Sequence, residues 1–368
     1  MTLNRRSFLL GISCLGLTSP LLWARANSQA PVRFYSARAD HRGRYYLTAL
    51  DASGRLLLDV PLPGRGHGLA IHPLRKEVAV FARRPGRFLM VIDIDSGRVV
   101  HQVESAVDRH FFGHGVFSRD GRLLYTTEND LGNDRGVIGV RDTEDGYRLV
   151  AELPSHGIGP HELKLTRDGR MLVVANGGIL TRPETGRTKL NLDSMSPSLA
   201  YIDPESGNLR DELKLPKHLH KNSIRHLAIN DDDTICIGMQ FQGSSQERPP
   251  LVGLHRPGEA IRLLAAPAQV LDRMHNYCGS VTVDSTGQVF AISSPRGNLV
   301  TFWSAEEGAY LGHTDVTDGC GIAATGQAGE YFISSGKGEI IRYRMNDKSA
   351  KPLDGEAVPS ARWDNHMI

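Results

Sequence analysis

The sequence predicts an all-β protein, a seven-bladed β-propeller. A histidine motif recurs at a fixed spacing, weaker copies follow it, and the first unit lacks one strand. The clear copies contain His67, His114 and His161, which are 47 residues apart each time. In each copy Gly or Pro precedes the histidine, and a short apolar run, a polar turn and a second apolar run follow. A period of about 40–50 residues in β units is typical of propeller blades, including WD40-like repeats.

Three further units open less regularly along the chain. Residues 222–229 carry His226, residues 277–283 carry Cys278 and residues 319–324 carry Cys320. Turn residues such as Arg119-Asp120-Gly121 and Asp95-Ser96-Gly97 separate the strands inside a unit. Typical strand predictions within these units are 78–83, 89–94, 171–175 and 339–343.

The first unit is predicted to be one strand short. Residues 33–37, 44–50 and 55–60 read as strands without an inner strand before them. We expect residues 361–368 to supply the missing strand, because closure with strands from both termini removes exposed sheet edges. The count is then seven blades. A six-bladed ring is the alternative, if the last unit and the first three strands form one blade.

Residues 1–26 read as a twin-arginine signal peptide, and residues 27–368 as a single propeller domain. Asn4-Arg5-Arg6 precedes an apolar core at 9–22, and Ala24-Arg25-Ala26 reads as a cleavage site. The sequence therefore predicts export to the periplasm, with no membrane span in the mature form. Helical periodicity is not expected beyond this segment. The longest irregular stretch, 176–198, is predicted to be a lid or ligand loop.

The charge balance gives no sign of a nucleic-acid or membrane-surface partner. Cleavage would remove three arginines and no acids, which leaves 40 basic against 41 acidic residues, a net charge of −1. No linker or low-complexity tract divides the chain. We expect a monomer.

Residues at the start of propeller inner strands converge on one channel mouth. Imidazole and thiolate ligands suit copper, iron or zinc. The predicted metal-ligand set is His67, His114, His161, His226, His275, Cys278, Cys320 and His366. Polar residues expected near the same mouth, as partners of the histidines, are Glu128, Asn129, Glu162, Asn176, Arg225, Asp318 and Asp364. The alternative is that each histidine is a structural hydrogen-bond post between blades.

The cysteines leave several interpretations open. Cys278 and Cys320 sit at equivalent corners of neighbouring units, so they could form a disulfide, remain thiols or act as ligands. Cys236 lies in an apolar strand and reads as a core thiol. His218 and His220 lie between lysines, which favours a surface position.

Catalytic templates are scarce. The sequence has no Gly-x-Ser-x-Gly elbow, His-Glu-x-x-His motif, Gly-rich phosphate loop or Cys-x-x-Cys-His haem site. This argues against a nucleotide cofactor and c-type haem, and favours a binding protein over an enzyme. The alternatives are a propeller enzyme, lactonase-like or a copper oxidoreductase, and a protein-interaction scaffold.

Several segments resemble the DUF1513 family of twin-arginine-exported proteins, which are themselves similar to YncE-type and surface-layer seven-bladed propellers. The matching segments are 113–118, 125–130, 135–140, 160–163, 175–179, 189–199 and 363–366. The resemblance implies genes near imelysin-type iron-regulated proteins and di-haem peroxidase-like proteins. It therefore implies a periplasmic role in iron or metal handling, with an imelysin-type iron-uptake protein as a partner. Together, these observations predict a periplasmic propeller that binds a ligand, with a transition metal as the leading candidate, at its channel mouth.

Overall fold

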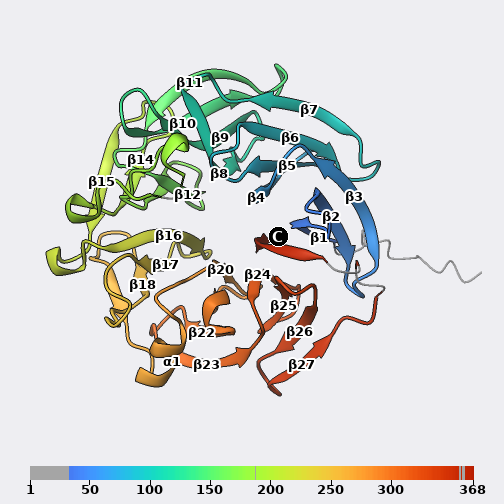
Figure 1. Ribbon diagram of the computed structural model, residues 1–368, viewed down its shortest axis with the longest axis vertical. Helices are drawn as coiled ribbons and strands as arrows, with labels where there is room; N and C mark the ends of the chain where they lie inside the picture. Colours follow the sequence, from blue (N-terminus) through green and yellow to red (C-terminus); the bar gives the residue numbers. More distant parts are fainter. Residues whose placement is uncertain (1–32, 187, 356–357, 359–360) are drawn as a thin grey trace, which may run out of the picture. The chain divides into compact units, whose positions relative to one another are not determined.

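The described residues fold into a ring of seven four-stranded antiparallel sheets (Figure 1). The structure is a computed structural model that describes residues 33–186, 188–355, 358 and 361–368. It confirms the all-β, seven-bladed propeller and excludes the six-bladed alternative. The predicted signal peptide at 1–26 and the predicted domain start at 27 lie outside the described residues.

The strands follow one another from the axis of the ring to its rim. The inner strands are β4 (Gly66–Ile71), β8 (Arg109–Phe117), β12 (Pro160–Leu165), β16 (Asn222–Ile229), β20 (Ser280–Val283), β24 (Gly319–Ala324) and β28 (Arg362–Met367). The second strands are β1 (Arg33–Ala39), β5 (Glu77–Ala82), β9 (Leu123–Asp130), β13 (Leu172–Asn176), β17 (Ile235–Phe241), β21 (Val289–Ser294) and β25 (Glu330–Ser335).

The two remaining positions of each blade lie farther out. The third strands are β2 (Tyr45–Asp51), β6 (Phe88–Asp93), β10 (Arg135–Asp142), β14 (Ser198–Ile202), β18 (Val252–His255), β22 (Leu299–Ser304) and β26 (Ile340–Arg344). The outer strands are β3 (Leu56–Leu62), β7 (Val99–Glu104), β11 (Arg148–Pro154), β15 (Leu209–Lys214), β19 (Arg262–Leu264), β23 (Tyr310–Asp315) and β27 (Ser349–Pro352).

The C-terminal strand closes the ring as predicted. β28 pairs antiparallel with β1 and supplies the inner strand of the first blade. The backbone N–H of Tyr35 donates to the Ile368 carbonyl at 2.8 Å, and the Ile368 N–H donates back at 3.1 Å. Both ends of the domain are thus hydrogen-bonded within one sheet.

Apolar side chains pack between neighbouring blades. Seven buried clusters exist among the described residues, and each draws its members from two adjacent sheets, so every blade interface has its own core. The second strands are buried on both faces, which explains their continuous apolar runs. Outer strands such as β23 alternate between exposed and half-buried residues, because one face meets solvent.

Short helical segments lie in the loops that join the strands. In the described chain they are η1 (Pro183–Thr185), η2 (Leu192–Ser194), η3 (Lys217–Leu219), η4 (Pro295–Gly297) and one α-helix, α1 (Ala268–Arg273). The sequence did not predict α1, because six residues are too few for helical periodicity to show. Its Val270 packs into the core between two blades, which holds the helix in place. Across the described part of the chain, no helix has the length and apolar character needed to cross a bilayer.

Candidate metal centre

β-bulges interrupt the inner strands where the histidines lie. Six of the seven pairings between an inner and a second strand shift register, and only the β20–β21 pairing is regular in the described chain. The shifted stretches contain or adjoin five histidines, His67, His114, His161, His226 and His366. A bulge redirects a side chain from the regular alternation of a strand.

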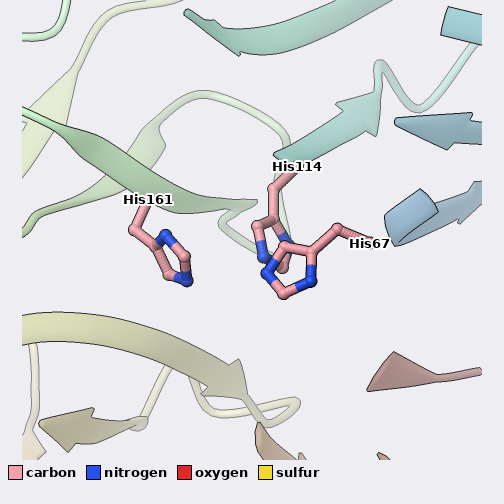
Figure 2. A group of neighbouring side chains, drawn as sticks. All are labelled: His67, His114 and His161. Atoms are coloured by element: carbon pink, nitrogen blue, oxygen red, sulfur yellow. The ribbon is translucent and has the colours of Figure 1, made fainter. Parts of the chain in front are cut away.

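These five histidines form one cluster at the axis, and we call it the five-histidine cluster. Neighbouring rings have centroids 4.5 to 6.1 Å apart. Figure 2 shows His67, His114 and His161 from three successive blades, with their rings directed into the same central space. All five side chains are buried. The propeller therefore brings together imidazoles that lie up to 299 residues apart in the sequence.

Two triads within the cluster have the spacing of a metal site. They are His67, His114 and His161, and His114, His226 and His366. In each triad one nitrogen per ring lies within 4.8 Å of the others. Nitrogens that bind one ion at about 2.1 Å in tetrahedral geometry are about 3.4 Å apart, so a nitrogen pair of either triad would need to close by at most about 1.4 Å.

Two glycines make room for the rings. A Cβ on Gly68 would lie 2.4 Å from the Gly113 carbonyl oxygen and 2.7 Å from Nδ1 of His114. A Cβ on Gly113, whose φ is +111°, would lie 2.6 Å from Cδ2 of His67. The glycines beside the repeated histidines are therefore required by close approach of neighbouring blades.

Two buried carboxylates orient rings of the cluster. Asp364 Oδ1 lies 2.7 Å from His67 Nδ1, and Asp364 Oδ2 accepts from Arg65 Nε at 2.6 Å. Glu162 Oε2 lies 3.3 Å from His226 Nδ1, and Glu162 Oε1 lies 2.9 Å from Lys164 Nζ. A carboxylate on one ring nitrogen leaves the other nitrogen free to bind a metal.

Burial keeps the five imidazoles neutral near pH 7. Desolvation lowers the pKa of His67 to about 4, although Asp364 opposes the shift. Burial also lowers the pKa of His226, and it lowers those of the other three well below the ordinary value. Burial alone would raise the pKa of Glu162, but Lys164 and His114 hold it well below its usual range. Neutral imidazoles beside ionised carboxylates are the protonation states that a metal site requires.

Three fully buried ring nitrogens of the cluster have no hydrogen-bond partner among the described residues. Nε2 of His114, His226 and His366 is buried and meets no donor or acceptor among the described residues. These are the members of the second triad. In the first triad, Arg225 donates to Nδ1 of His161 at 3.5 Å, so the neutral ring carries its proton on Nε2. The second triad is therefore the better set of ligands.

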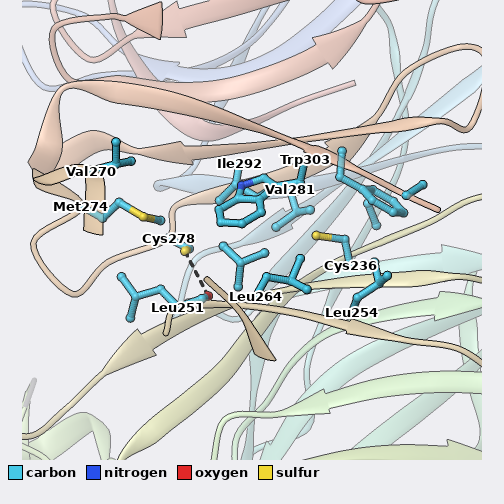
Figure 3. Close-up of a cluster of buried hydrophobic side chains, with 14 of the residues drawn as sticks. Cys236, Leu251, Leu254, Leu264, Val270, Met274, Cys278, Val281, Ile292 and Trp303 are labelled. Carbon is cyan, nitrogen blue, oxygen red and sulfur yellow. Dashed lines mark hydrogen bonds between the residues drawn. The ribbon is translucent and has the colours of Figure 1, made fainter. Parts of the chain in front are cut away.

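The structure places three of the eight predicted ligands outside the cluster. Cys278 lies in the apolar core between the fifth and sixth blades with Cys236, and its Sγ donates to the Leu251 carbonyl at 3.5 Å (Figure 3). Cys320 donates to the Asp318 carbonyl at 3.0 Å. Neither belongs to a triad, and both are free and buried, so they form no disulfide with each other. His275 follows α1 with φ +47° and reaches only the cavity described below.

The predicted polar partners also divide into two groups. Glu162, Asp364 and Arg225 contact cluster histidines, as described above. The other four make contacts within and between blades. Glu128 pairs with buried Arg141 at 2.7 Å, and Asn176 donates to the Ser155 carbonyl at 2.8 Å. Asn129 is buried on β9 with an unpartnered Oδ1, and the Asp318 carbonyl accepts from the Cys320 thiol. Asn129 makes no side-chain hydrogen bond to a described histidine.

Other contacts of the cluster were missed by the sequence reasoning. Thr127 Oγ1 donates to the His114 carbonyl at 3.1 Å, Ser36 Oγ donates to the His366 carbonyl at 2.7 Å, and Ser280 Oγ lies 3.5 Å from His366 Nδ1. A single Ser or Thr on a strand carries no functional signal. Lys164 could have been predicted, because it follows Glu162 by two residues, and residues i and i+2 of a strand lie on the same face.

A cavity of about 1020 Å³ opens onto the cluster, and we call it the basic chamber. His67, His161 and His226 are part of its wall, and so are Thr181, Arg182 and Lys189 from the 176–198 loop. The loop thus borders the site, as a ligand loop would.

The comparisons with known proteins agree with the fold. The family model "Protein of unknown function (DUF1513)" matches residues 60–368. Among solved structures, a chain of Kuenenia stuttgartiensis hydrazine synthase is similar with a TM-score of 0.62, at 14% identity, over 87% of this chain and 95% of that chain. At that identity the likeness concerns the fold alone. The comparison with curated proteins gives no match. The family match spans most of the sequence and all seven inner strands, so the chain belongs to the DUF1513 family.

Proposed function

We propose that this propeller binds one transition-metal ion in its five-histidine cluster. The observation that carries the proposal is the second triad: three buried imidazoles, each with an unpartnered Nε2, and with one nitrogen of each within 4.8 Å of the others. A buried polar atom without a partner costs about 1–3 kcal/mol, so three of them in one place are expected to share a ligand.

The residues around the triad suit that ion. His226 is oriented by Glu162, and the same carboxylate lies 3.9 Å from Nδ1 of His114. Asp364 and Glu162 supply negative charge that offsets the charge of a bound cation. None of the three described thiols joins the cluster, so its donors there are imidazoles, which suit zinc, copper or iron.

A purely structural role explains the cluster less well. A hydrogen-bond post between blades needs a partner for each ring, and His72 shows such a post, with Nε2 against the Gly121 carbonyl at 3.0 Å and Nδ1 accepting from two backbone N–H groups. His114 and His366 instead leave Nε2 unused.

Calorimetric titration of the metal-free protein with zinc(II), copper(I) and iron(II) tests the proposal. We expect one ion per chain with a dissociation constant below micromolar, and a loss of at least tenfold in affinity for His114→Ala and His366→Ala. His255→Ala is the matched control, since His255 is equally buried but lies on β18 in the third-strand position. Binding weaker than micromolar, or equal in all four proteins, would leave the histidines without a metal role.

The proposed location and partner of the protein rest on the sequence predictions. We place the mature protein in the periplasm as a monomer, exported by the twin-arginine pathway and serving iron or other metal handling beside an imelysin-type partner. Mass spectrometry of the periplasmic fraction tests the export step. The expected mature chain begins near Asn27, and a mature species that still carries Arg5 would contradict it.

A further inference from the structure

The basic chamber carries a charge imbalance that the metal site does not explain. Its described wall contains eight Arg or Lys side chains and no Asp or Glu. Seven come from segments between strands and Arg225 comes from β16, so the excess does not follow from any one sequence motif. A wall of one sign focuses its field inside a cavity and attracts ligands of the opposite sign.

Part of this positive charge is balanced by carboxylates beyond the wall. Arg182 pairs with Asp134 at 2.8 Å, Arg248 with Asp272 at 2.7 Å and Arg65 with Asp364 at 2.6 Å. In the first two pairs neither partner is buried, and such exposed pairs contribute little to stability, whereas Asp364 of the third pair is buried.

Three other cations of the wall have no described carboxylate within ion-pair distance. Arg225 is buried, and the side chains that it contacts by hydrogen bonds among the described residues are Ser223, at Oγ and 3.0 Å, and the His161 ring. The guanidinium of Arg296 lies 4.3 Å from the centroid of the Tyr277 ring. The third of these cations, Lys189, lies in the loop at residues 176–198. Stacking on an aromatic ring positions an arginine without neutralising its charge.

The cations of the wall also act on one another. Desolvation, together with Arg225 and Arg296, lowers the pKa of Lys189. Arg225 is buried next to the like charge of Arg84. A buried guanidinium without a counter-charge is costly, and an anion between these groups would remove that cost.

We propose that the basic chamber binds a small organic polyanion, one that carries two or more carboxylate or phosphate groups. Guanidinium and ammonium groups recognise both kinds of oxyanion through charge-assisted hydrogen bonds. A volume of about 1020 Å³ is at the upper end for small-molecule sites and exceeds what a single phosphate would fill. The proposal concerns the wall of the chamber and does not depend on a metal in the five-histidine cluster.

Calorimetry on the full-length mature, metal-free protein tests this inference with four probes: citrate, pyrophosphate, inorganic phosphate and sucrose. We expect citrate or pyrophosphate to bind with a dissociation constant in the micromolar range that weakens as sodium chloride is raised. Phosphate should bind at least tenfold more weakly, and sucrose should not bind. Preference for citrate identifies a carboxylate ligand, and preference for pyrophosphate a phosphate ligand.

Two double variants separate the chamber from general charge effects. Lys189→Gln with Arg296→Gln removes two exposed cations of the wall and should reduce the affinity for the better polyanion at least tenfold. Arg170→Gln with Lys351→Gln removes the same charge from exposed positions outside the wall and should leave the affinity unchanged.

Polyanion binding is tested independently of metal binding. His114→Ala, which is expected to lose metal, should keep polyanion binding, because His114 is not part of the chamber wall. The inference is overturned if neither polyanion binds more tightly than millimolar, or if both double variants lose affinity equally. Failure of zinc, copper and iron to bind would instead count against the five-histidine cluster only.

Discussion

Replacing Gly68 with alanine tests whether close packing between two blades positions the metal ligands. Gly68 lies in the bulge of β4 and has no positive φ, so alanine is allowed by the backbone and acts only through its added methyl. That methyl would meet the Gly113 carbonyl at 2.4 Å and His114 Nδ1 at 2.7 Å. To regain ordinary contact at 3.4 Å, the His114 ring must move by about 0.7 Å and the carbonyl by about 1.0 Å.

Both stability and metal binding should respond. Overpacking of this kind typically costs about 1–3 kcal/mol in the free energy of unfolding. Metal–ligand distances in a formed site lie within about 0.2 Å of their ideal values, so a His114 ring displaced by about 0.7 Å must be drawn back against the added methyl, which should weaken zinc binding at least tenfold, or about 1.4 kcal/mol. Urea denaturation of the metal-free protein gives the first quantity, and zinc calorimetry gives the second.

Gly326→Ala is the matched control. A Cβ at Gly326 has no atom within 4 Å, and its φ is also ordinary. This variant should bind zinc like the wild type and be equally stable or up to about 1 kcal/mol more stable, because alanine restricts the unfolded chain. A Gly68→Ala protein with wild-type zinc affinity and an unchanged urea midpoint would refute the reasoning.

Three further outcomes are expected. The metal-free protein should lose stability as the pH falls from about 6.5 towards 4, because the unfolded chain takes up protons before the buried imidazoles do. The loss from His67 alone should be roughly 3 kcal/mol in the free energy of unfolding. Equal urea midpoints at pH 7.5 and 5 would contradict this. Arg141→Met should cost about 3–5 kcal/mol, since it leaves Glu128 buried and unpaired, and adding Glu128→Gln should restore at least half of the loss in urea denaturation. Cys278→Ser should leave zinc affinity unchanged, and native Cys278, whose pKa burial raises to about 12, should resist a thiol reagent until the protein unfolds; rapid labelling of the native protein would count against its place in the core.

The regular features of the propeller could be predicted from local sequence. The spacing of His67, His114 and His161 repeats because each inner strand opens a structurally equivalent blade, and turn residues mark the strand ends. The strand missing from the first unit required a donor, and β28 was the segment left to supply it. These features depend on short-range patterns and on the need to pair every sheet edge.

Which of the predicted residues belong to the site depends on details that no local sequence pattern encodes. Cys278 occupies the same corner of its unit as the histidines do of theirs, yet it precedes the regular β20–β21 pairing by two residues and its side chain enters the core between blades. In a strand, a shift of one residue turns a side chain to the other face, so equivalent corners need not present equivalent atoms.

Only the tertiary structure assembled the basic chamber. Lys189, Arg225 and Arg296 lie in different blades, and each reads in the sequence as an ordinary charge near a strand end. Loop lengths and the ring of blades place them around one cavity, next to imidazoles contributed by five inner strands. Sequence spacing determines that residues share one end of a ring, but the distance between their side chains is determined by bulges, glycine contacts and loop paths, which are decided when the blades pack.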